Sequence, residues 1–333
     1  MSRLLVFGLG YTASLVAERL TADGWHVVGT TRDGRDGTIR FDDSDAVAAE
    51  IAAATHILSS VPPEHEADPV LVRYGALLLR TRAWLGYLSS TGVYGDAGGA
   101  WVDETAPIGG GRRSARAAAD ADWLALGART FRLPGIYGPG RSPLDRVRAG
   151  KAHRIEQPGQ VFSRAHVDDI VSGVIAGFDA PAGAYNLADD VPASQNDVVA
   201  FAAMLLGMPA PPFVTLDELS AMGRGFYNEN RRVANGKAKR VLGWTPAWPI
   251  GQFDDARHLE LLSGQSSDHP KRAPTGGRDR LADGAGGCRG ADVAGGRRCP
   301  LRHAQRRRRR RPSGRPHPDR ARPLHGLRGL EGG

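Results

Sequence analysis

Cysteine is almost absent from this chain of 333 residues. The two cysteines, Cys288 and Cys299, lie near its carboxyl end, and residues 1–262 contain none. A disulfide framework is therefore excluded over residues 1–262, as is usual in the cytoplasm, where thiols stay reduced. No run of 18 or more apolar residues occurs either, and Met1 leads into an apolar strand rather than a signal sequence. We therefore expect a cytoplasmic protein with no membrane partner.

Negative charge is scarce toward the carboxyl end. Residues 263–333 contain 18 basic and 6 acidic residues, so this tail carries +12 and the rest of the chain −4, within a formal net charge of +8. Arg, Gly and Pro dominate the tail, and residues 306–311 are all arginine. A segment of this composition cannot bury enough apolar area to offset its loss of conformational entropy, so we expect the tail to be disordered.

An arginine-rich tail can bind nucleic acid without sequence preference. This one has no aromatic residue that could stack on bases, and Cys288, Cys299 and His303 lack the paired spacing of metal ligands. We therefore predict no metal site. We favour an out-of-frame extension over a nucleic-acid interface as the interpretation of the tail, and we expect a small-molecule partner instead.

The first thirty residues predict a β-α-β unit with a glycine-rich turn. An apolar strand at residues 4–7 leads into Gly8-Leu9-Gly10-Tyr11-Thr12-Ala13, a helical pattern follows, and a second strand covers residues 25–29. Gly8 permits the tight turn, Gly10 leaves room for a pyrophosphate, and the small Ala13 lets the helix pack closely on the sheet. The N–H groups at the start of the helix would face the phosphates. The predicted cofactor residues of this turn are Gly8, Gly10, Tyr11, Thr12 and Ala13.

The end of the second strand indicates which dinucleotide is bound. An Asp or Glu about 20 residues beyond the glycines would hold an adenosine 2′-OH, whereas a 2′-phosphate favours a basic residue there. This chain has Thr30, Thr31 and Arg32 at that place. We therefore predict NADP as the cofactor, with NAD as the alternative because Asp33 lies next to Arg32.

Strands continue to alternate with helices after this unit. The pattern predicts strands at residues 38–41, 56–61 and 85–90, and helices at 45–54, capped by Ser44 or Asp45, and at 68–84. This alternation predicts an α/β fold with a doubly wound parallel Rossmann sheet, whose ligand lies at the carboxyl ends of the strands. Ser60 and Val61 end one such strand and are predicted to form a wall of the cofactor site.

Five further segments complete a resemblance to a known family. They are residues 85–96, 131–140, 162–170, 184–188 and 239–246, which include Ser90-Thr91-Gly92-Val93-Tyr94-Gly95 and Leu133-Pro134-Gly135-Ile136-Tyr137-Gly138. With the glycine turn, these segments resemble the extended branch of the short-chain dehydrogenase/reductase superfamily, the NAD-dependent epimerase/dehydratase family. They occur in the order of that family and cover nearly all of residues 3–250.

The resemblance implies roles for particular residues. Ser90, with Thr91 beside it, corresponds to the Ser/Thr that hydrogen-bonds the reacting oxygen, and Pro134, Gly135 and Ile136 would lie along the nicotinamide. The implied reaction is hydride transfer to or from a small carbonyl or nucleotide-sugar-like substrate. The implied organisation is a Rossmann domain at residues 1–150 and a smaller α/β substrate lobe at 151–262, interleaved with the first, in a monomer or homodimer.

The sequence departs from this family at the general acid/base. The family uses a tyrosine with a lysine four residues later, because the ammonium lowers the phenol pKa from about 10. The expected place, residues 107–123, contains no tyrosine, and the first lysine of the chain is Lys151. Tyr94 and Tyr137 could substitute, although packing is the expected role of each. This departure is typical of atypical members of the superfamily and leaves a second hypothesis open, a non-catalytic NADP(H)-binding protein that senses the redox state.

Overall fold

The computed structural model of the chain describes residues 2–110 and 114–248. The predictions made for the tail at residues 263–333 lie outside the described residues. The same holds for Arg112 and Arg113 within the segment where the family has its tyrosine and lysine.

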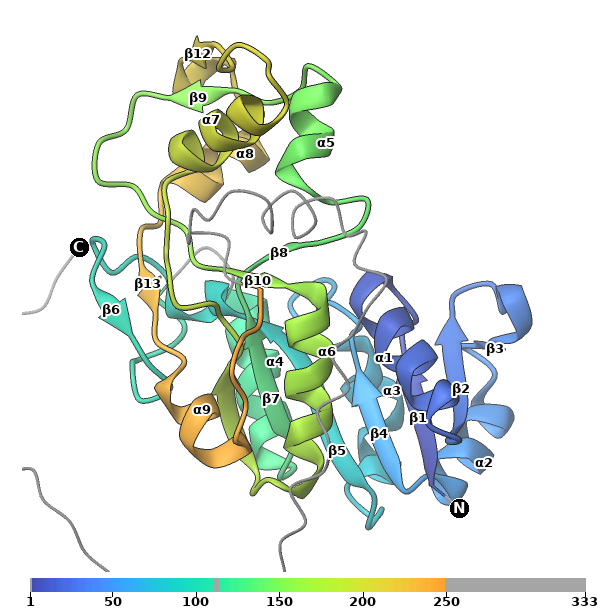
Figure 1. The fold of residues 1–333 in the computed structure, drawn as a ribbon. Helices are drawn as coiled ribbons and strands as arrows, with labels where there is room; N and C mark the ends of the chain where they lie inside the picture. Colours follow the sequence, from blue (N-terminus) through green and yellow to red (C-terminus); the bar gives the residue numbers. More distant parts are fainter. Residues whose placement is uncertain (1, 111–113, 249–333) are drawn as a thin grey trace, which may run out of the picture. The chain divides into compact units, whose positions relative to one another are not determined.

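A seven-stranded sheet organises the described residues (Figure 1). Its order is β11-β7-β5-β4-β1-β2-β3, and every neighbouring pair is parallel. The strands are β1 (Arg3–Phe7), β2 (His26–Thr31), β3 (Ile39–Arg40), β4 (His56–Ser59), β5 (Trp84–Ser90), β7 (Arg129–Leu133) and β11 (Gly183–Asn186). The chain winds outward from β1 in one direction and from β4 in the other. This is the predicted doubly wound Rossmann arrangement, with its switch point between β1 and β4.

Helices cover both faces of this sheet. These helices are α1 (Tyr11–Ala22), α6 (Val167–Ala176) and α9 (Gly236–Leu242) on one face, and α2 (Ser44–Ala53), α3 (Pro69–Leu78) and α4 (Ser114–Ala125) on the other. Three more helices, α5 (Pro143–Arg148), α7 (Gln195–Leu205) and α8 (Ala221–Tyr227), lie outside these two layers. Side chains of a strand point alternately to opposite faces. In β1, Leu4 and Val6 pack against α1 and α6, whereas Leu5 and Phe7 pack against α2, α3 and α4. Burial of each such side chain contributes about 1.5–3 kcal/mol.

A smaller group of elements surrounds another apolar cluster, drawn apart from the sheet in Figure 1. It contains α5, α7, α8, and the paired strands β9 (Arg154–Ile155) and β12 (Phe213–Val214). Two more parallel pairs are β8 (Gly135–Tyr137) with β10 (Arg164–His166), and β6 (Trp101–Val102) with β13 (Arg232–Val233). The chain returns to the sheet through α6 and β11, so residues after 150 contribute to it. The predicted domain boundaries stay predictions.

Several element ends differ from those predicted. The cap of α2 is Asp43 rather than Ser44 or Asp45, because the Asp43 carboxylate accepts the Ala46 N–H at 3.1 Å. Helix α3 ends at Leu78 rather than at residue 84, since Trp84 already pairs with His56 in the sheet. None of the helices in the described ranges combines the length and the apolar composition that a membrane span requires.

Candidate functional site

The glycine turn joins β1 to α1 at the carboxyl end of the sheet, beside its switch point. Gly8 has a φ of +78°, and a Cβ on it would lie 2.8 Å from Cγ2 of Val61, so the turn requires glycine. A Cβ on Gly10 would meet nothing within 4 Å, so that side of the turn is open. Within the described part of the chain, no side chain caps the first turn of α1. The turn therefore offers open space and backbone donors at a helix N-terminus, where an anion is stabilised.

Hydroxyl groups from the carboxyl ends of β2 and β4, the two strands that flank β1, hold the turn in place. The buried Thr30 accepts the Gly8 N–H with its Oγ1 at 3.2 Å, and Ser60 Oγ donates to the Gly8 carbonyl at 2.5 Å. Thr31 Oγ1 accepts the Gly34 N–H at 3.0 Å and lies 2.6 Å from Thr38 Oγ1. These hydroxyls therefore orient the backbone around the turn, which the sequence interpretation did not assign to them.

A cavity of about 410 Å³, here called the turn cavity, lies beside the glycine turn. Seven of the predicted cofactor residues line it: Gly8, Gly10, Thr30, Thr31, Arg32, Ser60 and Val61. Sequence reasoning missed the other lining residues, which are Leu9, Arg35, Phe41, Pro62, Glu64 and Pro69. Tyr11, Thr12 and Ala13 do not line this cavity. Thr12 and Ala13 are buried in α1, and the Tyr11 hydroxyl donates to the Pro139 carbonyl at 3.0 Å.

Arg32 projects from the end of β2 into solvent, with its side chain 88% exposed. Its Nη2 lies 2.6 Å from Oε1 of Glu64, which belongs to the loop after β4. Asp33, the carboxylate that the sequence places beside Arg32, instead lies 3.3 Å from Nη1 of Arg35. The carboxylate that pairs with Arg32 therefore belongs to Glu64, which lies 32 residues later in the sequence. No local sequence signal could reveal this pair.

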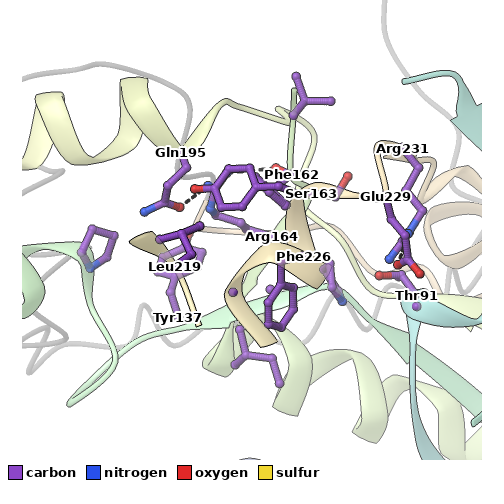
Figure 2. A pocket seen from close by; sticks show the side chains of 18 of the residues that line it. Thr91, Tyr137, Phe162, Ser163, Arg164, Gln195, Leu219, Phe226, Glu229 and Arg231 are labelled. Carbon is purple, nitrogen blue, oxygen red and sulfur yellow. Dashed lines mark hydrogen bonds and ion pairs between the residues drawn. The ribbon is translucent and has the colours of Figure 1, made fainter. Parts of the chain in front are cut away.

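A second cavity, of about 1010 Å³ and here called the large cavity, lies at the carboxyl ends of β5 and β7 (Figure 2). It brings together the predicted catalytic and nicotinamide residues Ser90, Thr91, Pro134, Gly135 and Ile136. Its remaining walls come from α5, β10, α7, α8 and residues 229–233. Because these segments are far apart in sequence, periodicity and motif spacing could not predict them as one site.

The Ser90 hydroxyl caps the short 3₁₀ helix Thr91–Tyr94, which follows the carboxyl end of β5. Its Oγ accepts the Gly92 N–H at 3.1 Å. A hydroxyl that accepts one hydrogen bond still has its own proton to donate. Ser90 is therefore fixed in orientation and can donate to an oxygen atom in the large cavity.

Positive charge predominates among the side chains of the large cavity. Four arginines line it, Arg141, Arg146, Arg164 and Arg231, against two carboxylates, Glu218 and Glu229. Glu229 Oε2 lies 3.0 Å from Nη1 of Arg231, and Figure 2 draws this pair together. Glu218 accepts from the backbone and the hydroxyl of Thr215 in a capping box. Both carboxylates therefore have local partners, and the cavity favours an anionic ligand.

Arg164 is the most deeply buried of these arginines, at 7% exposure. Its Nη1 donates to the carbonyls of Phe162 and Ala193, both at 2.9 Å, and its Nη2 donates to Gln195 Oε1 at 3.1 Å (Figure 2). Burial lowers its pKa to about 10, so the guanidinium stays charged at neutral pH. The buried Asp189 carboxylate opposes this effect of burial on the pKa of Arg164. Because Arg164 lines the large cavity, its charge attracts an oxyanion there.

The two tyrosines that could replace the missing phenol have other partners. The Tyr94 hydroxyl donates to Asn186 Oδ1 at 2.8 Å and accepts from Arg132 Nη1 at 3.0 Å. Tyr137 donates to the carbonyl of Trp248. Burial raises the pKa of Tyr94, although Arg132 opposes this, and burial raises the pKa of Tyr137 well above its ordinary value. Neither tyrosine therefore supplies a phenol with a lowered pKa.

Arg116 is the basic residue that the structure describes within residues 107–123, the segment where the family has its tyrosine and lysine. It lies in the first turn of α4 and donates from Nη1 to the Tyr87 hydroxyl at 3.0 Å. Burial nevertheless raises the pKa of Tyr87 to about 12. Within residues 2–110 and 114–248, no group of three or more His, Cys, Asp or Glu side chains could hold a metal ion.

No family model matches the chain. Among curated proteins, it is 29% identical over 265 residues to Protein YeeZ of Escherichia coli strain K12, a match that covers 71% of this chain and 94% of YeeZ. It is also 31% identical over 170 residues to a 3-diazoavenalumate denitrifying reductase of a Streptomyces species. That match covers 44% of this chain and 56% of the reductase.

Several solved structures resemble the chain. A functionally unknown conserved protein from Silicibacter pomeroyi is 38% identical, with a TM-score of 0.67 over 80% of this chain and 98% of that protein. Human epimerase family protein SDR39U1, solved with NADPH, is 17% identical, with a TM-score of 0.60 over 79% of this chain and 100% of that one. The dTDP-glucose 4,6-dehydratase of Bacillus anthracis, solved with NAD, is 17% identical. Its TM-score is 0.62, and the match covers 79% of this chain and 95% of the dehydratase. The last two likenesses show a shared fold.

Proposed function

Because the chain has the fold of the extended short-chain dehydrogenase/reductases and belongs to one family with the Silicibacter pomeroyi protein, we propose that it is a nicotinamide-dependent oxidoreductase. It binds NADP, and NAD less tightly, along the glycine turn. It transfers hydride to or from a small carbonyl compound or a nucleotide-sugar-like substrate in the large cavity. The observation that carries this proposal is that the open turn at Gly10 and the Ser90 hydroxyl both lie at the carboxyl end of one parallel sheet.

The residues around the turn cavity fit a dinucleotide. The open side of Gly10 and the uncapped start of α1 suit a pyrophosphate. Arg32 supplies a cation for an adenosine 2′-phosphate. Pro134, Gly135 and Ile136 line the large cavity and form the wall for the nicotinamide. The bound cofactor supplies or accepts the hydride, and the chain positions it.

The large cavity suits a substrate that carries an oxyanion. The Arg164 guanidinium, which lines the cavity, attracts that group, and Ser90 donates a hydrogen bond to the oxygen at the reacting carbon. A keto acid and a nucleotide sugar both carry an oxyanion and an oxygen at the reacting carbon. The Streptomyces relative is by name a reductase and the Bacillus structure by name a nucleotide-sugar dehydratase, so both classes belong in a substrate screen.

The missing Tyr-x-x-x-Lys motif supports a second candidate function. A protein that binds NADP(H) and senses its redox state requires the turn cavity but no tuned phenol. The raised pKa values of Tyr94 and Tyr137 favour this candidate, because burial keeps both phenols protonated near neutral pH.

Turnover separates the two functions. The full-length chain is mixed with NADPH or NADP and a panel of keto acids, hydroxy acids and nucleotide sugars, and the loss or gain of NADPH absorbance is followed. An enzyme gives turnover that falls about 100-fold in Ser90→Ala, since one donor to the reacting oxygen is removed.

Ser89→Ala is the matched control, because Ser89 is buried and does not line the large cavity. We expect it to leave turnover unchanged. Tight NADPH binding without turnover on any member of the panel would favour the sensor. Equal losses in both serine variants would contradict the role of Ser90.

A further inference from the structure

The loop that carries Glu64 forms a hydrogen-bonded hairpin turn. Glu64 and Ala67 exchange both of their backbone hydrogen bonds, at 2.9 and 3.0 Å. The two residues between them, His65 and Glu66, have φ angles of +46° and +70°. This is the geometry of a two-residue hairpin turn in which both central residues have positive φ, a conformation that non-glycine residues adopt at a cost.

Both ends of this hairpin are anchored as well. Pro62 and Pro63 precede it and restrict the chain there. Asp68 follows it, and its Oδ1 caps α3 by accepting the Val70 N–H at 2.8 Å, while its Oδ2 accepts from Trp123 Nε1 at 2.9 Å. The position of Glu64 at the rim of the turn cavity is therefore fixed by the backbone around it. The pair itself is exposed, with the Arg32 and Glu64 side chains 88% and 46% exposed, so it contributes little to stability and its carboxylate can act on a bound ligand instead.

The charges around Arg32 differ for the two nucleotides. Arg32 Nη2 already has a carboxylate partner, Glu64 Oε1 at 2.6 Å. A phosphate monoester at the adenosine 2′ position carries nearly two negative charges and needs the same guanidinium. A 2′-hydroxyl is uncharged and makes no such demand. Glu64 therefore opposes only the phosphorylated nucleotide.

We propose that Glu64 is a specificity-determining residue, which competes with the adenosine 2′-phosphate for Arg32 and so limits the preference of the chain for NADP over NAD. This inference rests on the proposed binding of a nicotinamide dinucleotide at the glycine turn. Asp33 does not have this role, because its carboxylate pairs with Arg35. The negative charge that tunes cofactor choice is thus supplied from the loop after β4 rather than from the end of β2.

The experiment is an equilibrium titration of NADPH and of NADH into the full-length chain and its variants. Removing the charge in Glu64→Gln should tighten NADPH binding roughly three- to tenfold, while NADH binding changes less than about twofold. Glu66→Gln is the matched control, since it removes the same charge from the same hairpin at a position that does not line the turn cavity. We expect it to change neither affinity. Thermal unfolding confirms that each variant is folded.

Competition for Arg32 is tested by introducing Glu64→Gln into a protein that already carries Arg32→Ala. Competition for Arg32 predicts that the gain from Glu64→Gln then shrinks to less than about twofold. An equal gain in both backgrounds would mean direct repulsion of the phosphate and would overturn the competition. A weaker NADPH affinity in Glu64→Gln would also overturn it, because Glu64 would then be holding Arg32 in position.

The outcomes distinguish this inference from the proposed function. If the wild-type chain binds NADPH and Glu64→Gln has no effect, the inference fails and the proposed function stands. If the folded wild-type chain binds neither nucleotide, both fail.

Discussion

The buried ion pair of Arg132 with Asp120 should be essential to stability. Arg132 Nη2 lies 2.7 Å from Asp120 Oδ1, and the two side chains are 3% and 0% exposed. Arg132 also donates to Tyr94, which bonds to Asn186. The network therefore ties β7 and α4 to the 3₁₀ helix that follows Ser90, so it also supports the geometry of the large cavity.

Asp120→Ala would leave the Arg132 guanidinium buried without a countercharge. Breaking a buried pair in this way costs about 3–5 kcal/mol, a large share of the 5–15 kcal/mol that usually stabilises a protein. The free energy of unfolding, measured by urea denaturation followed by circular dichroism, should fall by that amount. Replacing the whole pair by apolar side chains, as Asp120→Leu with Arg132→Met, should restore most of the loss.

The exposed pair of Arg19 with Asp23 provides the control. Its atoms are 3.2 Å apart and its side chains are about half exposed, at 48% and 50%. Asp23→Ala should therefore cost no more than about 0.5 kcal/mol. A loss of less than about 1 kcal/mol in Asp120→Ala would refute the reasoning, because it would mean that the buried arginine finds water or another partner.

Two further predictions concern the switch point and α6. Gly8→Ala should cost about 2–3 kcal/mol in urea denaturation, because the residue has positive φ and its Cβ would crowd Val61; a neutral effect would contradict the turn geometry. Burial raises the pKa of Asp169 to about 7, although its carboxylate accepts the N–H groups of Ala247 and Trp248. The folded state then holds this proton more tightly than the unfolded state, whose pKa is about 3.9, so stability falls as pH rises from about 4 to 7. Between about pH 5 and pH 8 the wild type should lose about 2.6 kcal/mol more than Asp169→Asn, and equal losses would contradict the raised pKa.

The sheet and the glycine turn could be predicted because their signals are local. Apolar strands, helical spacing and Gly8 with Gly10 occur within thirty residues, and the structure forms β1, α1 and β2 from them. The predicted Rossmann fold is confirmed by the parallel sheet and by the fold shared with the human and Bacillus structures. The individual cofactor and catalytic residues stay predictions.

The rest of the site depends on contacts between distant segments. Glu64 meets Arg32 only because the loop after β4 lies beside the end of β2. Arg164 reaches Gln195, and Arg231 reaches the Gly95 carbonyl, across 31 and 136 positions. Hydroxyl residues were also ambiguous in sequence, since Thr30 and Ser60 hold the turn through hydrogen bonds that no spacing rule predicts.

Nucleotide binding to Gly10→Val tests the central claim most directly. Gly10 has a φ of −93°, which any residue adopts, and its Cβ would enter open space, so the variant should fold, with the loss of about 1 kcal/mol that Val in place of Gly at the N-cap of α1 costs. A branched side chain there would nevertheless occupy the place of the pyrophosphate. Calorimetric titration of NADPH should therefore show binding to the wild-type chain and none to folded Gly10→Val. Equal NADPH affinities in the two proteins, or no binding to the wild type, would contradict the account.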